Sequence, residues 1–404
     1  MRIVVAGGGA AGFFGAIAAA ESIADAEVIL LEKSPELLAK VTISGGGRCN
    51  VTHACFDPKE LSTRYPRGGR ELIGPFHRWQ PRDTVDWFES RGVKLKTEAD
   101  GRMFPTTDKS TTITDCLLKQ ARNAGVQIVT GKGLLDVNRT EKGFVLRLTS
   151  KETLACDRLL IATGGNQASA GRSIAESLGH TIVPPVPSLF TFNVKDRRIE
   201  GLAGLSVAKA EASVPSQKLS QRGPVLITHW GFSGPAILKL SAWGARVLHD
   251  VGYDFELVIN WLPAVRVEER LRALKVEHAK RCVVAWSPFP EIATRLWASL
   301  IRSAGVPDDR QWATLSRLEL DAMTKALGAC AFHARGKSMF KDEFVTCGGV
   351  SLKEVDFKTM QSRVCPGLYF AGEVLDIDGV TGGFNFQAAW TTGWIAGKSM
   401  GQEG

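Results

Sequence analysis

The chain has no long apolar run and no concentrated block of charge. No apolar run approaches the roughly 18 residues that a membrane-spanning helix needs. Lysines and arginines are spread along the chain and never form the block typical of a nucleic-acid-binding tail. The opening residues, MRIVVAGGGAAG, indicate a first β-strand rather than a signal peptide. We therefore expect a cytoplasmic protein with no part in a membrane.

Paired cysteines are also missing. The eight cysteines include no CxxC pair and no Cys/His cluster with zinc spacing, so we expect reduced thiols and no metal site. Cys49 and Cys55 lie six residues apart, which favours a packed cysteine over a redox dithiol.

The composition is that of a globular protein, with 44% apolar and 23% charged residues. At 404 residues, two or more domains are expected. The formal net charge of +8 favours anionic partners, and a phosphate-bearing cofactor accounts for it as well as nucleic acid does. Nothing in the sequence indicates an oligomeric state.

The first motif is Gly7-x-Gly9-x-x-Gly12, between an apolar strand at 3–6 and an alanine-rich helix at 10–24. Glycines let the turn close and the backbone approach a pyrophosphate, whose charge the helix N-terminus stabilises. A second strand at 27–31 ends at Glu32, where a carboxylate can accept hydrogen bonds from ribose hydroxyls. This order predicts dinucleotide binding with a free ribose. The alternative is a glycine-rich turn with a surface glutamate.

The second motif is SGGGRCN, residues 44–50. Glycines without side chains leave room for a pyrophosphate and the edge of a flavin, and Arg48 supplies a cation. A purely structural turn is the alternative.

Two later segments complete the pattern. LLIATGG (159–165) is typical of the strand that returns near the adenine side of flavin folds. In 367–397, Glu373 follows an apolar strand, where it can bind a ribityl chain. Gly382 and Gly383 precede a helix whose first amides, near Phe384 and Asn385, can stabilise the anionic edge of reduced flavin.

The organisation predicts one domain interrupted by another. PPVP (184–187) is expected to break regular structure, and short β-like pieces follow it. A glycine-rich strand–turn–helix pattern, like that at the N-terminus, appears again from about residue 345. We expect an FAD-binding domain formed by 1–187 and 344–404, and an inserted domain at 188–343 that is β-rich over 188–262 and helical over 263–328.

Together these segments resemble the glutathione-reductase-type FAD fold and, more narrowly, the YhiN/BaiN-like bacterial flavoproteins, which include aminoacetone oxidases. SGGGRCNVT, GRMFPTTDKS, THWGFSGPAILKLS and TCGGVSLKEVD carry the resemblance. It implies an α/β fold with a Rossmann-like FAD domain, an inserted β-barrel-like and helical domain, and non-covalent FAD. His53 stands where that family usually has Asn, which leaves the substrate open.

The site residues expected from the motifs and the resemblance form two sets. The FAD-binding set is Gly7, Gly9, Ala10, Ala11, Gly12, Glu32, Lys33, Lys40, Ser44, Gly45, Gly46, Gly47, Arg48, Cys49, Asn50, Leu134, Ala162, Thr163, Gly164, Gly372, Glu373, Gly382, Gly383, Phe384, Asn385 and Phe386. The catalytic candidates are His229, Arg48 and Arg335. The alternative for His229 is a structural or cofactor-adjacent role, and the alternative for Arg335 and the nearby His333 is a solvated hinge.

The expected function is that of an FAD-dependent oxidoreductase. No second strand–GxGxxG–helix unit is present, so NAD(P)H must bind transiently, or electrons come from the substrate or a protein. The resemblance implies hydride transfer between flavin N5 and a small substrate, either to reduce an activated C=C bond or to oxidise an amine with dioxygen. We favour the reductase; an RNA-modification-linked flavoprotein and a redox sensor are further alternatives. The inserted domain, around 228–234, is expected to face the flavin.

Overall fold

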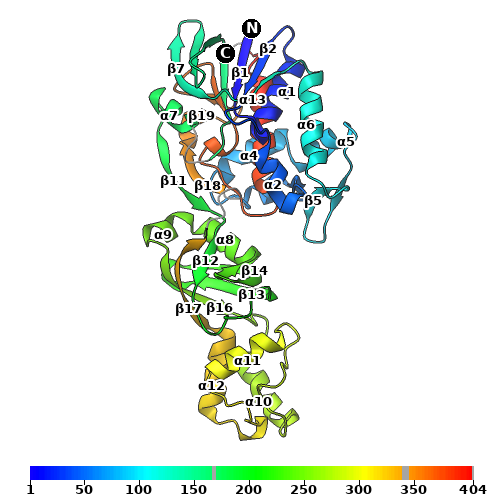
Figure 1. Ribbon diagram of the computed structural model, residues 1–404, viewed down its shortest axis with the longest axis vertical. Helices are drawn as coiled ribbons and strands as arrows, with labels where there is room; N and C mark the ends of the chain where they lie inside the picture. Colours follow the sequence, from blue (N-terminus) through cyan, green and yellow to red (C-terminus); the bar gives the residue numbers. More distant parts are fainter. Residues whose placement is uncertain (166–169, 339–344, 403–404) are drawn as a thin grey trace. The chain divides into compact units, whose positions relative to one another are not determined.

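The computed structural model describes residues 1–165, 170–338 and 345–402. The chain divides into two compact units (Figure 1). The first consists of Met1–Pro187 and Lys341–Gly404, and the second of Ser188–Phe340.

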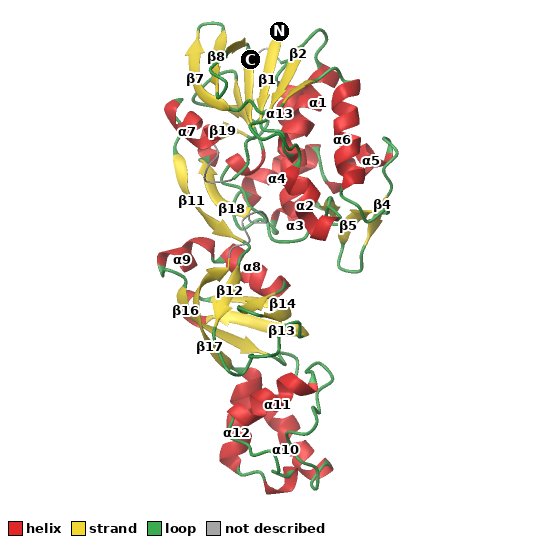
Figure 2. Ribbon diagram, in the orientation of Figure 1, coloured by secondary structure: helices red, strands yellow, loops and turns green. Residues whose placement is uncertain are grey.

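The first unit is built on a seven-stranded sheet in the order β19-β20-β21-β10-β1-β2-β6 (Figure 2). At its centre, β1 pairs in parallel with both β2 and β10. These strands are almost wholly apolar, because a parallel sheet is covered on both faces. The sheet strands are β1 (Arg2–Ala6), β2 (Glu27–Leu31), β6 (Gln127–Val129), β10 (Arg158–Ile161), β19 (Val355–Asp356), β20 (Gln361–Ser362) and β21 (Leu368–Phe370).

Two helices from opposite ends of the chain pack closely in this unit. They are α1 (Ala10–Ser22) and α13 (Phe384–Ser399), which lie side by side in Figure 2. A Cβ at Gly393 would lie 2.4 Å from Ala11 O, and one at Gly397 would lie 2.4 Å from Gly15 O. The two backbones therefore touch, which only glycine permits.

The rest of the first unit surrounds this core. An antiparallel sheet is formed by β7 (Leu134–Thr140), β8 (Gly143–Leu148) and β9 (Thr153–Cys156). Another contains β3 (Thr52–His53), β5 (Arg102–Pro105) and β4 (Leu95–Thr97). The helices are α2 (Ala39–Gly47), α3 (Pro58–Ser62), α4 (Gly69–Arg78), α5 (Pro81–Glu89), α6 (Thr111–Asn123) and α7 (Ala170–Ser177).

One local expectation is wrong. PPVP does not break regular structure, because β11 (Ile182–Ser188) runs through it and pairs with β18 (Val345–Val350). Proline is compatible with such a two-stranded sheet, where each strand has an edge without a partner.

The second unit contains a closed barrel in the order β12-β15-β14-β13-β16-β17. Its core includes Phe192, Phe232, Trp261 and Phe332, each at most 2% exposed. The expected fold class, α/β with a β-barrel-like and helical insertion, is confirmed. The strands are β12 (Thr191–Val194), β13 (Ser206–Val214), β14 (Leu219–Thr228), β15 (Gly231–Ser233), β16 (Asp254–Asn260) and β17 (Cys330–Ser338); the helices are α8 (Pro235–Trp243), α9 (Ala245–Asp250), α10 (Val267–Glu277), α11 (Thr294–Ser303) and α12 (Arg317–Gly328).

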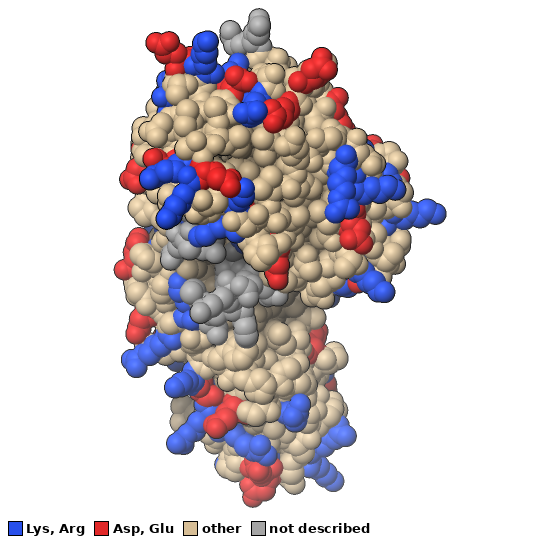
Figure 3. All heavy atoms as spheres, turned by 45° about the horizontal axis from the view of Figure 1, so that its top comes forward, with Lys and Arg blue, Asp and Glu red and all other residues tan. Residues whose placement is uncertain are grey.

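On the face shown in Figure 3, Lys and Arg side chains are interspersed with Asp and Glu. Among the described residues, none of the helices combines the length and the apolar character needed to cross a membrane.

Candidate cofactor site and active site

Gly7 and Gly9, in the turn between β1 and α1, and Gly12, in the first turn of α1, differ in their packing. Gly7 has φ +116°, and a Cβ there would lie 2.3 Å from Ala162 O. A Cβ at Gly12 would lie 1.8 Å from Gly7 O, so the fold itself demands glycine at both positions. A Cβ at Gly9 would have no atom within 4 Å. Gly9 is the N-cap of α1 and leaves open space where an anion can approach the helix N-terminus.

Glu32 is oriented by this turn. Its Oε2 accepts a hydrogen bond from Gly8 N at 2.7 Å, and its Oε1 accepts one from Ser34 N at 2.8 Å. Each carboxylate oxygen keeps acceptor capacity beyond these bonds. The half-buried carboxylate is therefore fixed and still able to accept hydrogen bonds from a ribose.

The SGGGRCN segment forms a left-handed loop at the end of α2. Gly45, Gly46 and Gly47 have φ values of +58°, +68° and +82°, and Cys49 also has a positive φ, +61°. A Cβ at Gly46 or Gly47 would have no atom within 4 Å. The loop exposes backbone and leaves the space that a bound dinucleotide would need.

Arg48 is held by acidic side chains that the sequence analysis did not single out. Its Nη1 lies 2.7 Å from Glu98 Oε1 and 3.6 Å from Asp108 Oδ1. The guanidinium also lies 4.0 Å from the centre of the Phe104 ring. The hydrogen bond to Glu98 raises the Arg48 pKa. Arg48 is therefore a paired cation. Asp108 and Phe104 belong to the GRMFPTTDKS segment, which carried the family resemblance and was the only feature of the sequence that pointed to these partners of Arg48.

Cys49 is fully buried and unsuited to thiolate chemistry. Burial raises the pKa of its thiol to about 12. All eight cysteines are free thiols. Cys49 packs in the loop, and its nucleophilic form is strongly disfavoured.

Glu373 joins several segments of the first unit. Its Oε2 lies 2.6 Å from Lys40 Nζ, and its Oε1 accepts from Thr346 N at 3.0 Å. Arg172 is buried and donates to Gly165 O; burial lowers the Arg172 pKa, and the Glu373 charge partly offsets this. Thr346 lies in the quoted TCGGVSLKEVD segment, whereas nothing in the local sequence pointed to Arg172.

Thr163, just beyond the carboxyl end of β10 in the seven-stranded sheet, carries a polar group without a hydrogen-bond partner among the described residues. Its Oγ1 is buried and has no hydrogen-bond partner in the part of the chain that the structure describes. It follows β10 directly, next to Ala162, whose carbonyl contacts the Gly7 turn. A buried hydroxyl without a partner favours a bound polar ligand, because leaving it unsatisfied costs roughly 1–3 kcal/mol.

The start of α13 presents backbone amides after two strained glycines. Gly382 and Gly383 have φ values of +128° and +91°. With its amide oriented toward the helix, Asn50 accepts from Gly383 N at 2.9 Å and so connects the two glycine-rich segments. The Asn385 side chain is occupied by both backbone groups of Gly379, and Phe386 stacks on Trp390. Any stabilisation of an anion therefore comes from the backbone and the helix dipole.

His53 lies against the same helix start. Its ring stacks on Phe384 with centroids 4.7 Å apart and an interplanar angle of 23°. Nε2 lies 3.1 Å from Asp100 O, while the buried Nδ1 has no partner among the described residues. Burial lowers the His53 pKa. The only sequence signal was its departure from the family's usual Asn.

The other two catalytic candidates lie in the second unit. His229 is exposed in the turn between β14 and β15. Arg335, on β17, is also exposed; its Nε lies 3.4 Å from Asp254 Oδ2 and 3.1 Å from His333 Nε2. Val194 N on β12 donates a hydrogen bond to Trp230 O, and Val194 pairs with Ala334 on β17. His229 and Arg335 are the sequence neighbours of Trp230 and Ala334, so both candidates lie next to residues that contact the same position of β12.

The predicted cofactor residues thus converge from five segments of the first unit. Direct contacts join the Gly7 turn to Ala162, Glu32 to Gly8, Lys40 to Glu373, Asn50 to Gly383, and Gly372 to Ala11. Leu134 is buried at the start of β7, and Lys33 is exposed. The described residues contain no His, Cys, Asp and Glu group able to hold a metal ion.

A βαβ unit with an oriented acidic residue, open glycine positions and a buried unpaired hydroxyl defines a dinucleotide-binding protein, and these residues fit FAD. The chain belongs to the family described as HI0933-like protein Rossmann domain, which matches residues 1–399. It is an FAD-dependent oxidoreductase. The expected FAD and the resemblance to the YhiN/BaiN-like flavoproteins are thereby confirmed.

Two curated relatives span essentially the whole chain. One is "3-dehydro-bile acid delta(4,6)-reductase" of Clostridium scindens, 30% identical over 415 residues and covering 99% of both chains. The other is "Ribosomal RNA dihydrouridine synthase" of Escherichia coli, 30% identical over 412 residues and covering 98% of this chain and 97% of the relative.

Solved structures share the fold at low sequence identity. The 3-ketosteroid-delta4-(5alpha)-dehydrogenase from Rhodococcus jostii aligns with a TM-score of 0.52 and 14% identity, over 99% of this chain and 96% of that one. A flavocytochrome c3 fumarate reductase aligns with a TM-score of 0.52 and 17% identity, over 99% and 78%.

Proposed function

We propose that this protein reduces a carbon–carbon double bond conjugated to a carbonyl group, with NAD(P)H as the electron donor. The names of the two relatives carry the proposal. A 3-dehydro bile acid with double bonds at positions 4 and 6 is a conjugated ketone, and uridine carries a C5=C6 bond conjugated to its C4 carbonyl. Two relatives, each 30% identical to this chain, are thus named for adding two hydrogens across the same kind of bond.

The reaction balances as a two-electron reduction. FAD, when bound, would supply the two-electron chemistry that links NAD(P)H to the carbon β to the carbonyl. A proton must reach the α-carbon, and NAD(P)⁺ is released. We assign proton donation to His229, an exposed imidazole in the β14–β15 turn. This assignment includes the proposal that residues 228–234 face the substrate.

The other site residues hold the cofactor and balance its charge. Glu32 binds the ribose, and the open positions at Gly9, Gly46 and Gly47 admit the pyrophosphate. The amides at the start of α13 stabilise negative charge beside them. Arg48 is tied to Glu98 and acts as a positioning group, while Arg335 offers a cation to a substrate oxygen.

The unsaturated group has two candidate sources, a small ketone and a uracil ring in RNA. The expectation from sequence favoured a small molecule. One observation favours RNA: residues 188–340 contain 21 Lys and Arg against 14 Asp and Glu, whereas the rest of the chain contains 29 against 28. The inserted unit thus carries a formal +7 of the total +8, although the FAD-binding residues lie in the other unit. A polyanionic substrate accounts for this division.

Anaerobic stopped-flow absorbance tests the proposal. NADH or NADPH should bleach the visible flavin band, and a 3-oxo-4,6-diene steroid or a uridine-containing RNA should restore it. Bleaching by an amine alone, with peroxide formed in air, would replace the reductase with the amine oxidase. Absence of reoxidation by either unsaturated substrate would overturn the proposal.

His229 and the cofactor are tested separately. Denaturation should release FAD and not FMN. His229→Ala should keep FAD content and bleaching by NAD(P)H but slow substrate-dependent reoxidation by roughly 100-fold or more. His278→Ala, in the helical part of the same unit, is the matched control. Equal rates for the two variants would remove His229 from the mechanism.

A further inference from the structure

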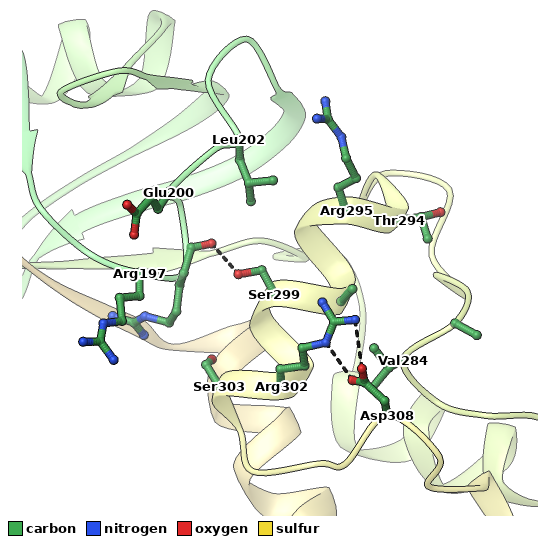
Figure 4. Close-up of a pocket in the computed structure, with 13 residues that line it drawn as sticks. Arg197, Glu200, Leu202, Val284, Thr294, Arg295, Ser299, Arg302, Ser303 and Asp308 are labelled. Atoms are coloured by element: carbon green, nitrogen blue, oxygen red, sulfur yellow. Dashed lines mark hydrogen bonds and ion pairs between the residues drawn. The ribbon is translucent and has the colours of Figure 1, made fainter.

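A groove of about 930 Å³ lies within the second unit, between the segment after β12 and helix α11 (Figure 4). None of its lining residues belongs to the predicted FAD-binding or catalytic sets. Four arginines line it: Arg197, Arg198, Arg295 and Arg302. Glu200 and Asp308 are the acidic residues of the lining.

The lining mixes charged, hydroxyl-bearing and small apolar side chains. Its apolar members are Leu202, Val284, Ala285 and Ala298, and it contains no aromatic residue. Small-molecule pockets are mostly apolar and aromatic, and grooves that read bases use aromatic rings for stacking. A groove rich in arginine and without aromatic rings matches phosphate groups, which position a nucleic acid without reading its sequence.

The four arginines differ in how far their charge is already used. Arg198 donates to Asp196 and to Ala331 O, and its guanidinium lies 4.1 Å from the centre of the Phe332 ring, so it belongs to the architecture. Arg302 pairs with Asp308 at 2.7 Å, but both side chains are more than half exposed. Such an exposed pair contributes little to stability and can exchange partners.

Arg197 and Arg295 are the available cations. Both are exposed, and neither has an ion pair or side-chain hydrogen bond among the described residues. They come from opposite walls of the groove: Arg197 from the segment after β12, and Arg295 from the first turn of α11 (Figure 4). The first turn of α11 contains no acidic residue, so nothing there opposes an anion.

We propose that this groove binds the phosphodiester backbone of an RNA strand. The proposal deepens the proposed function and rests on it, since it gives the uracil-containing substrate a docking surface on the inserted unit. Arg197 and Arg295 contact phosphates, Arg302 joins them by leaving Asp308, and Glu200 sets a repulsive limit on the strand's position.

Fluorescence anisotropy with a labelled single-stranded oligouridylate tests this on the FAD-loaded protein. The double variant Arg197→Ala/Arg295→Ala should raise Kd about tenfold. It should also lower the slope of log K against log salt by about 1.4, because each phosphate contact on a single strand contributes about 0.7. Glu200→Gln should lower Kd. FAD content and thermal unfolding verify that each variant is folded.

The matched control is Arg266→Ala/Arg317→Ala, which removes two highly exposed arginines of the same unit that do not line the groove. It should leave Kd within about twofold and the salt slope unchanged. If both double variants weakened RNA binding equally, the RNA would be attracted by the overall charge of the protein, and the proposal of a binding groove would be wrong. If NADPH displaced the RNA and its binding depended equally on Arg197 and Arg295, the groove would be a nucleotide site and the RNA proposal would be wrong. Absence of RNA binding would also contradict the proposal.

Binding is measured without turnover, so the two proposals fail separately. Loss of binding in the groove variant together with unchanged reoxidation by a steroid enone supports the groove. If RNA binding depended on the groove but no conjugated bond was reduced, the proposed function would be wrong. The groove would then remain an RNA-binding site.

Discussion

Lys40 Nζ lies 2.6 Å from Glu373 Oε2, across 333 residues of sequence. The other oxygen of Glu373 accepts from Thr346 N, so one carboxylate links α2, β18 and the end of β21. Glu373→Gln should weaken FAD binding about tenfold or more, because hydrogen bonds to a charged group contribute roughly 1.5–3 kcal/mol. Titration of the apoprotein with FAD by flavin fluorescence measures this.

Lys40→Met is the control for that ion pair. The Lys40 side chain is 47% exposed, so its pair with Glu373 should contribute less than about 1 kcal/mol to stability. We expect a smaller loss of FAD affinity than for Glu373→Gln. A larger loss would mean that the lysine itself contacts the cofactor.

Gly9→Ala should separate cofactor binding from folding. The added Cβ meets open space at a residue with φ −94°, so apoprotein stability should change little. The methyl group occupies the space assigned to the pyrophosphate, and FAD affinity should fall about 100-fold or more. Gly12→Ala, whose Cβ would lie 1.8 Å from Gly7 O, should instead destabilise the apoprotein. Calorimetry of both apoproteins and FAD titration distinguish the two effects, and unchanged FAD affinity in Gly9→Ala would contradict the site.

His53 should make stability dependent on pH. Burial lowers its pKa from the ordinary 6.5, with Arg64 acting in the same direction and Asp100 and Glu60 opposing. Above pH 6.5 its contribution is fully present. As the pH falls toward the lowered folded pKa, the unfolded state takes up a proton that the folded state does not, and stability is lost.

His53→Asn should therefore flatten the stability profile below about pH 6.5, measured by chemical denaturation. His180, whose pKa burial also lowers, keeps its own contribution in both proteins. An unaltered slope in His53→Asn would show that the imidazole is solvated.

Thiol labelling should single out Cys282. It has intermediate exposure, whereas the other seven cysteines are buried. Under native conditions a thiol reagent should modify Cys282 first, and Cys282→Ser should remove the fast phase. Cys49, with a pKa of about 12, should react only on unfolding. Fast labelling of Cys49 would revive the redox hypothesis.

Local sequence determined the cofactor half of this protein. Gly7, Gly9, Gly12 and Glu32 lie within one βαβ unit, where a turn that only glycine can form and the alternation of buried strands and helix leave a readable pattern. The β-rich and then helical character of the insertion was also predictable from the sequence pattern after residue 187, whereas its barrel form was implied by the family resemblance. These features depend on neighbours in sequence, so the sequence carries them.

Contacts between distant segments were decided by the tertiary structure alone. Arg48 was expected to supply a cation, but its acidic partners Glu98 and Asp108 are brought to it only by folding. PPVP was expected to interrupt the fold, yet a strand more than 150 residues later pairs with it. The arginine groove joins Arg197 to Arg295 across almost a hundred residues. Such partners are chosen by packing and charge in three dimensions, and neither periodicity nor spacing along the chain encodes which segments will meet.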